Sequence, residues 1–167
     1  MKLLELGANP NIKIDDGPSL MGLMIRSKDS RYLKKALEYK CDPNFVWPRT
    51  DHSLNSLIYS GQSEERLKLL LEYGADPNYS KHPETNPIFT ALDTRSYEYI
   101  PILLENGADI LSDSNSKDKF IKMLEENVQF AGTKEYKEQI KLVNYLKEKY
   151  GFEINLKYPK GRPRSEM

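Results

Sequence analysis

The segment Leu70-Leu-Glu-Tyr-Gly-Ala-Asp-Pro-Asn78 decides the fold of this 167-residue chain. Similar phrases occur three more times: Leu3–Asn11, Ala36–Asn44 and Leu103–Leu111. The glycine position of the phrase recurs at intervals of 33, 34 and 33 residues: Gly7, Lys40, Gly74 and Gly107. A fixed period of this length is typical of repeat proteins, in which similar units stack on their neighbours.

Local chemistry predicts a helix, a turn and a second helix in each unit. Leu67, Leu70 and Leu71 recur at i, i+3 and i+4, which gives one apolar helical stripe. Gly74 supplies the left-handed residue that ends the helix, and Asp76-Pro-Asn78 turns the chain. First helices are expected over the shorter apolar runs at 53–59 and 87–92. A second apolar series agrees with the period: Leu20, Leu54 and Ile88, each 34 residues apart.

This pattern resembles the ankyrin repeat family. The family's second-helix phrase, L-L-x-x-G-A-D-x-N, is nearly intact in Leu70–Asn78. Its first-helix phrase, T-P-L-H-x-A, survives in outline three times: Asn86–Ala91, His52–Leu57 and, more weakly, Pro18–Leu23. The resemblance covers residues 1–111. It implies an all-α solenoid of stacked helix–turn–helix units with hairpin-like finger loops.

We expect one ankyrin-repeat domain over residues 1–155 and a flexible basic tail over 156–167. Its units are a partial repeat at 1–11, repeats at 12–44, 45–78 and 79–111, and an extended capping repeat at 112–155. Gly151 follows Gly107 by 44 residues, so about ten residues are inserted, which we place around Glu126–Glu135. Helices are predicted over Lys119–Asn127 and Lys134–Tyr150. The second carries apolar spacing at these residues: Tyr136, Ile140, Val143, Leu146 and Lys147.

The N-terminal edge of the array leaves three interpretations open. Met1 begins inside a second helix, so no first helix precedes Leu3 and Leu4. The segment is a short, frayed helix packed on the next repeat, the start codon is wrongly assigned, or a partner or second copy covers the edge. We therefore expect a monomer unless a second copy covers this edge.

Composition excludes several classes of protein for this chain. The 25 Lys and Arg balance 25 Asp and Glu, which removes the usual argument for a nucleic-acid-binding domain. A hydrophobic fraction of 38% is low for a compact domain but suits a stack that buries one stripe per helix. The lone Cys41, the lack of a signal peptide and the lack of a long apolar run favour a cytoplasmic protein without membrane spans.

The sequence offers no enzyme motif, and we expect no catalytic activity, cofactor or metal. Gly-rich phosphate loops, H-E-x-x-H, C-x-x-C and G-x-S-x-G are all absent. His52 takes the family's Thr position before a first helix, so a local hydrogen bond or simple exposure is expected. His82 lacks neighbours at metal-ligand spacing. Cys41 stands where the repeat has Ala, so we expect a small, packed and unreactive residue.

The resemblance implies a concave recognition surface made by the fingers and the exposed side of the first helices. The fingers correspond to these segments: Asn11–Gly17, Phe45–Asp51, Tyr79–Thr85 and Leu111–Asp118. The second finger contains aromatic and basic residues of the kind that dominate interfaces. The candidate partner-binding residues come from two fingers and two first helices: Phe45, Trp47, Arg49, Tyr59, Tyr79, His82, Phe89 and Asp93.

Two of these residues have an alternative explanation within the fold. Trp47 can fold back as a lid on the neighbouring finger, and Phe89 can pack inside the repeat. Finger charges are mixed in sign, so no single-sign field steers a charged partner. We expect recognition by shape and aromatic side chains.

The expected function is binding of one protein partner. Short stand-alone ankyrin proteins resemble inhibitors or immunity proteins that neutralise a toxin or enzyme, and we adopt this as the specific expectation. An effector-type adaptor for host proteins is the alternative. Pro159–Arg164 also resembles the core of an AT-hook, so DNA contact through the tail is a third, weaker hypothesis.

Overall fold

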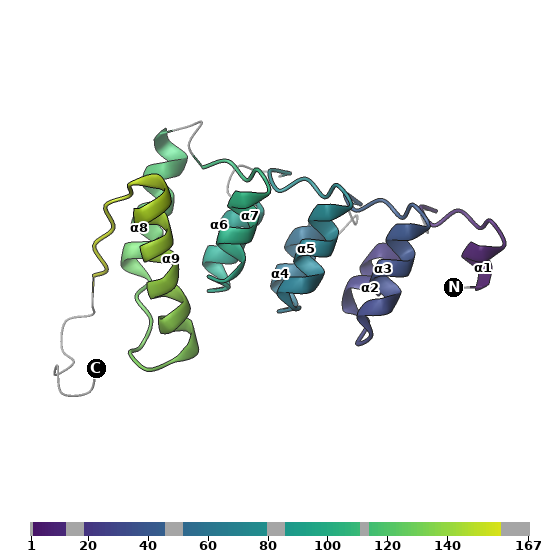
Figure 1. Cartoon of the computed structure of the whole chain (residues 1–167), viewed down its shortest axis with the longest axis horizontal. Helices are drawn as coiled ribbons and strands as arrows, with labels where there is room; N and C mark the ends of the chain where they lie inside the picture. The colour runs from purple at the N-terminus through teal and green to yellow at the C-terminus, as the bar shows by residue number, and fades with distance from the viewer. Residues whose placement is uncertain (1, 13–18, 46–51, 80–85, 111–113, 158–167) are drawn as a thin grey trace. The chain divides into compact units, whose positions relative to one another are not determined.

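The computed structural model describes residues 2–12, 19–45, 52–79, 86–110 and 114–157. The chain is all-α over these ranges, and they contain no strand. It forms two compact units, residues 1–90 and 91–167, whose boundary falls inside helix α6 (Pro87–Asp93) (Figure 1). The prediction of a single domain with the repeat boundaries given above stays a prediction.

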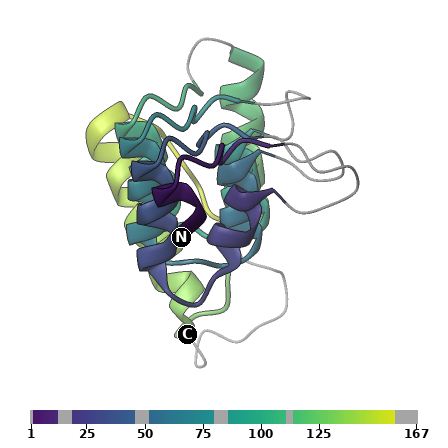
Figure 2. The same ribbon diagram turned by 90° about the vertical axis from the view of Figure 1, so that its right-hand side faces the viewer.

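Unit 1 is built from a short helix and two helix pairs. The elements are α1 (Lys2–Glu5), α2 (Leu20–Arg26), α3 (Ser30–Glu38), α4 (Ser53–Tyr59) and α5 (Glu64–Glu72). Contacts within the pairs join α2 to α3 and α4 to α5, and contacts between the pairs join α2 to α4 and α3 to α5. The pairs therefore form two layers, with α2 and α4 in one and α3 and α5 in the other (Figure 2). The expected helix at 53–59 is confirmed.

N-terminal caps set the register of the first helices. Ser19 Oγ accepts from the Gly22 N–H (3.0 Å), and Asn86 Oδ1 accepts from the Phe89 N–H (3.0 Å). With His52 as the cap of α4, the three caps stand 33 and 34 residues apart. The apolar series is therefore Met21, Leu54 and Ile88, each at most 1% exposed. The prediction that Leu20 belongs to this series is wrong by one residue, because the first repeat is one residue shorter.

The ends of the second helices share one hydrogen-bond pattern. After α5, the Gly74 N–H donates to the Leu71 carbonyl and the Ala75 N–H to the Leu70 carbonyl, both at 2.9 Å. The same pair of bonds closes the other three copies of the phrase. This pattern requires a left-handed residue, and the four residues have φ between 62° and 92°: Gly7, Lys40, Gly74 and Gly107. The alignment of Lys40 with the glycines is confirmed.

Asparagine side chains join consecutive turns of unit 1. Asn11 Nδ2 donates to the Lys40 carbonyl (2.9 Å), and Asn11 Oδ1 accepts from the Asp42 N–H (2.8 Å). One repeat later, Asn44 binds the Gly74 carbonyl (2.9 Å) and the Asp76 N–H (2.7 Å) in the same way. The asparagine that ends each phrase thus satisfies backbone groups that the next helix end leaves open.

A buried arginine closes the end of α2. Arg66, on α5, is 5% exposed. Its Nη1 donates to the Ile25 carbonyl (2.8 Å) and to Gln62 Oε1 (2.9 Å), while Nη2 donates to the Ser27 carbonyl (2.6 Å). Carbonyls at a helix C-terminus carry partial negative charge, so a guanidinium is stabilised there without a carboxylate partner.

Unit 2 contains α7 (Tyr99–Glu105), α8 (Ser114–Glu126) and α9 (Lys134–Tyr150), with α7 packed on α9. The prediction of α9 is confirmed in both bounds. The predicted α8 was too short, because the helix begins at Ser114, and the assignment of Leu111–Asp118 to a finger is wrong over 114–118. The buried stripe of α9 also differs from the prediction and consists of these residues: Gln139, Leu142 and Leu146.

The inserted segment between α8 and α9 is held by a network of amides. Gln139 is fully buried, and its Nε2 donates to the Leu124 and Asn127 carbonyls (3.2 and 3.1 Å). Its Oε1 accepts from the Gln129 N–H (3.0 Å). The Tyr97 hydroxyl donates to the Asn127 carbonyl (3.3 Å) and accepts from Gln129 Nε2 (3.0 Å). These bonds hold the long connection between α8 and α9 in place.

Candidate functional site

The structure describes five of the eight candidate partner-binding residues. Trp47, Arg49 and His82 lie outside the described residues. The other five are placed on two finger bases and two helices: Phe45, Tyr59, Tyr79, Phe89 and Asp93.

Two hydrogen bonds close the base of the second finger. Asn44 Oδ1 lies 2.9 Å from His52 Nε2, and Ser53 Oγ donates to the Phe45 carbonyl (3.2 Å). These bonds join the residues that precede the finger to the residues that follow it. Phe45 is half-buried at this junction. We call the group Asn44, Phe45, His52, Ser53 and Tyr79 the finger-base cluster.

His52 is the centre of the finger-base cluster. Its Nδ1 accepts from the Leu54 N–H (3.4 Å), so Nε2 carries the proton and donates to Asn44 Oδ1. The side chain is 1% exposed, and its ring stacks on Tyr79 at 4.5 Å between centroids and 18° between planes. The predicted local hydrogen bond is confirmed, and the alternative of an exposed histidine is wrong.

Burial also fixes the charge of this imidazole. It lowers the pKa of His52 to about 4, although the Asp76 and Asp42 carboxylates act in the opposite direction. His52 is therefore neutral at pH 7, in the one tautomer that serves both hydrogen bonds. A neutral, buried and doubly bonded imidazole holds the base of the finger and does not act as an accessible base.

Tyr59 is the exposed aromatic residue of the first-helix layer in unit 1. It ends α4 and is 57% exposed, whereas Leu57 and Ile58, just before it, are at most 1% exposed. This tyrosine offers a large apolar area and a hydroxyl to a partner, on a helix whose other residues are mostly buried.

The two remaining candidates, both on α6, behave differently from each other. Phe89 is 4% exposed, which matches its packing alternative and not a partner contact. Asp93 is exposed. The accessible part of the predicted surface, within the described residues, is therefore smaller than the sequence indicated.

Cys41 behaves as the repeat pattern predicts. It is 3% exposed, and burial raises the pKa of its thiol to about 11. A thiol that stays protonated at pH 7 and is shielded from solvent is a poor nucleophile and a poor metal ligand.

The sequence analysis did not identify Asn44 as a residue that supports the candidate site. The phrase predicts a turn at Asn44, whereas its side chain bonds to three groups: Gly74 O, Asp76 N and His52 Nε2. The available signal was the recurrence of asparagine at the end of the phrase, at positions 11, 44 and 78.

No protein-family model matches the chain, and no curated protein matches it. The resemblance of the repeats therefore rests on the residues themselves. Over the described residues, no three His, Cys, Asp or Glu side chains are grouped as a metal site would need. The described helices are all too short or too polar to cross a membrane.

Proposed function

We propose that the chain is an array of ankyrin-type repeats that binds one protein partner without catalysing a reaction. The binding surface consists of the finger tips and the exposed side of the first helices. Two observations support the array: the side chains of Asn11 and Asn44 each bind the end of the next second helix, and left-handed helix ends recur. Each copy of the second-helix phrase therefore has a similar structural role.

The observation that carries the binding proposal is the exposure of Tyr59 on α4, the helix that begins at the hydrogen-bonded finger base. Phe45 and Tyr79 are half-buried at this base, where Ser53 Oγ donates to the Phe45 carbonyl and the His52 ring stacks on Tyr79. A partner would therefore meet aromatic groups that are already ordered, which lowers the entropic cost of binding. The sequence adds Trp47 and Arg49 to the same finger.

A more specific role follows from the resemblance alone. We propose an inhibitor or immunity-type protein that blocks a cognate toxin or enzyme. An adjacent toxin gene and restored target activity on complex dissociation would support this role. An effector-type adaptor is the alternative, and expression induced by a host would support it.

The experiment is an affinity purification from native lysate, with wild-type chain and Trp47→Ala as paired baits. We expect one stoichiometric protein on the wild-type bait and a dissociation constant about 30-fold higher for Trp47→Ala, as loss of an aromatic hot spot predicts. An unchanged dissociation constant assigns Trp47 to packing within the chain. Absence of any stoichiometric protein on the wild-type bait contradicts the proposed function.

A further inference from the structure

The strongest feature that the proposed function does not use is a pocket between α3 and α5, in the second-helix layer of unit 1. Its volume is about 180 Å³, and three residues of each helix line it: Ser30, Arg31, Lys34, Glu65, Arg66 and Leu69. Pockets that hold drug-sized molecules have volumes of about 300–1,000 Å³. This pocket therefore has room for one side chain or a small ion, and not for a larger molecule.

Arg66 brings a buried positive charge and an unused donor to this pocket. Its three hydrogen bonds come from Nη1 and Nη2, and each acceptor is an uncharged carbonyl oxygen. The Nε–H, a further donor of the guanidinium, makes no hydrogen bond to the described part of the chain. The charge of Arg66 acts on the Asp29 carboxylate, but that carboxylate is bonded to Arg31 at 2.7–3.0 Å. Arg66 is thus left without a carboxylate of its own.

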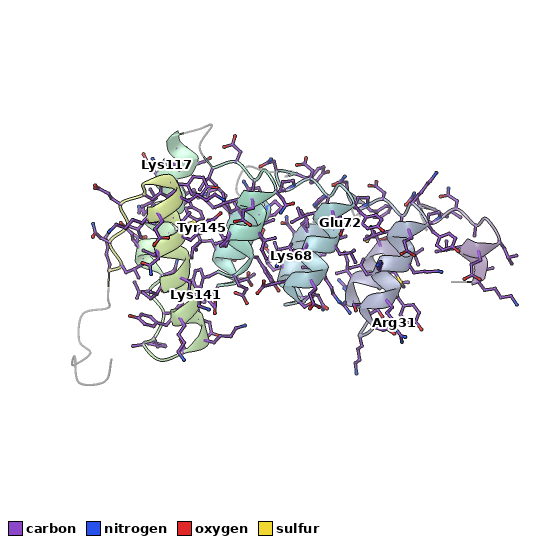
Figure 3. The ribbon with its side chains drawn as sticks, viewed as in Figure 1. Arg31, Lys68, Glu72, Lys117, Lys141 and Tyr145 are labelled. Atoms are coloured by element: carbon purple, nitrogen blue, oxygen red, sulfur yellow. The ribbon has the colours of Figure 1, made fainter. Side chains whose placement is uncertain are left out.

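The other charged residues of the pocket leave an excess of positive charge. Lys34 is exposed and has no hydrogen bond or ion pair with the residues that the structure describes. Glu65, the one carboxylate among the lining residues, is also exposed and unpaired within the described ranges. Arg31, near the start of α3 (Figure 3), is already paired with Asp29. Two cations without a carboxylate, Lys34 and Arg66, therefore face one carboxylate without a cation, which favours an added anion.

The lining of the pocket identifies this anion as a carboxylate on an apolar stem. The N–H groups of a guanidinium match the planar carboxylate, as the bidentate contact between Arg31 and Asp29 illustrates in this chain. Leu69 is half-buried and gives the pocket an apolar wall, which a methylene stem can contact. Inorganic phosphate has no apolar part and gains nothing from that wall. An acidic side chain matches both parts of the lining.

We propose that the pocket between α3 and α5 binds a glutamate or aspartate side chain of a partner protein. This pocket lies in the second-helix layer, whereas the surface of the proposed function lies on the fingers and the first-helix layer. The inference therefore does not depend on Tyr59 or Trp47, and its test can fail or succeed separately.

The test is an NMR titration of the isotope-labelled 167-residue chain at neutral pH and low salt, read at the Arg66 Nε–H and at the backbone amides of the lining residues. The probes are a blocked pentapeptide with one central glutamate, the same peptide with glutamine, and inorganic phosphate. We expect the glutamate peptide to shift these resonances saturably, with a Kd of roughly 1–10 mM. The glutamine peptide should shift none of them, and phosphate should bind about threefold more weakly or worse.

Three variants then locate the site. Lys34→Gln should raise the Kd of the glutamate peptide by about two- to fivefold, because it removes a cation without a partner. Glu65→Gln should lower this Kd by about two- to fivefold, since it removes the opposing carboxylate. Lys68→Gln is the matched control, at an exposed lysine of α5 that pairs with Glu64 outside the lining, and it should leave the Kd within about 1.5-fold of the wild type.

Three results would overturn the proposal. Equal shifts with the glutamate and glutamine peptides, or no shift at the Arg66 Nε–H, would show that the pocket does not bind a carboxylate. A Kd that responds to Lys68→Gln as strongly as to Lys34→Gln would show attraction by general surface charge. Phosphate that binds more tightly than the glutamate peptide would assign the pocket to a free anion instead of a side chain.

Discussion

At the scale of single residues, the Asn44 amide and the His52 imidazole hold together the base of the second finger. Asn44 serves the Gly74 carbonyl, the Asp76 N–H and His52, so one side chain connects a turn, the next helix end and a finger base. Asn11 makes the two corresponding bonds, to the Lys40 carbonyl and the Asp42 N–H, and the helix cap that aligns with His52 is Ser19. Variants at the two asparagines can therefore be compared to isolate the contribution of the His52 contact.

We predict that Asn44→Ala destabilises the chain by about 2–3 kcal/mol and Asn11→Ala by about 1–2 kcal/mol. The larger value reflects the additional bond to His52 and the deeper position of Asn44. Urea unfolding at pH 7 measures both free energies. Equal costs for the two variants would show that the His52 contact contributes nothing.

The depressed pKa of His52 predicts a stability that falls in acid. Its folded pKa, about 4, lies below the ordinary value of 6.5, so the unfolded chain binds the proton more readily. The contribution is complete above pH 6.5 and is lost as the pH falls from 6.5 toward 4. Between pH 7 and pH 5 the expected loss is about 2 kcal/mol.

The control for this pH dependence is His52→Asn, which keeps a good N-cap but cannot titrate. Unfolding free energies at pH 7 and pH 5 should differ less in this variant than in the wild type, by about 2 kcal/mol. The same slope in both proteins would place the acid sensitivity at another group.

Lys40 is the one non-glycine residue in the four left-handed helix ends, with φ of 62°. A side chain costs energy in this region, and glycine does not. Lys40→Gly should therefore raise the free energy of unfolding by about 0.5–1 kcal/mol, after the entropy that glycine adds to the unfolded chain. Gly74→Lys, with φ of 89°, should lower it by at least as much. Thermal and urea unfolding measure both changes, and a Lys40→Gly variant that is less stable than the wild type contradicts the cap assignment.

At the scale of secondary-structure elements, long side chains on one helix bind the carbonyls at the end of another helix. Arg66 reaches from α5 to the last carbonyls of α2, and Gln139 reaches from α9 to those of α8. The outer sides of α5 and α9 instead carry exposed charges, including Lys68 and Lys141 (Figure 3). The helix pairs of unit 1 are therefore joined by both apolar packing and a buried cation.

Arg66→Met should destabilise the chain by about 2–4 kcal/mol, because buried carbonyls lose charge-assisted bonds. Lys68→Met, two residues along the same helix but at a side chain 59% exposed, should change stability by less than about 0.5 kcal/mol. Urea unfolding of both variants measures the difference. Similar small effects would show that Arg66 contributes only its apolar stem.

The sequence patterns predicted the positions of helices better than they predicted the contacts between helices. Apolar runs located α4 and α9, and the period of the Leu-Leu-x-x-Gly phrase located the left-handed position of Lys40, since these features depend on local residue types. Arg66 and Gln139 could not be found this way, because nothing in a helical stripe reveals that a polar residue on it will meet the end of another helix. The Leu20 error has the same origin: a one-residue difference in repeat length is visible only once the Ser19 cap is seen.

The sequence predicted the kinds of residue that form the candidate site, but only part of their contacts and burial. Tyr59 was correctly expected to be exposed, and a local bond at His52 was expected, but its stacking on Tyr79 joins residues of different repeats. Phe89 occupies an aromatic position that a pattern cannot assign to surface or core.

At the scale of the whole molecule, the balance of 25 cationic and 25 anionic residues argues against bulk electrostatic steering of a partner. In the proposed function, the exposed apolar and aromatic groups carry the specificity. In unit 1 they lie on different elements: Tyr59 on α4, Tyr32 on α3, and Leu3 on α1. The proposed partner surface uses the first of these.

The most direct test of the central claim compares two exposed tyrosines by calorimetric titration against the purified partner. Tyr59 lies in the first-helix layer, and Tyr32, 47% exposed, lies on α3 in the other layer. We predict that Tyr59→Ala raises the dissociation constant about 30-fold, whereas Tyr32→Ala leaves it within about twofold of the wild type. Equal losses, or a loss at Tyr32 alone, would contradict a partner surface on the finger and first-helix side.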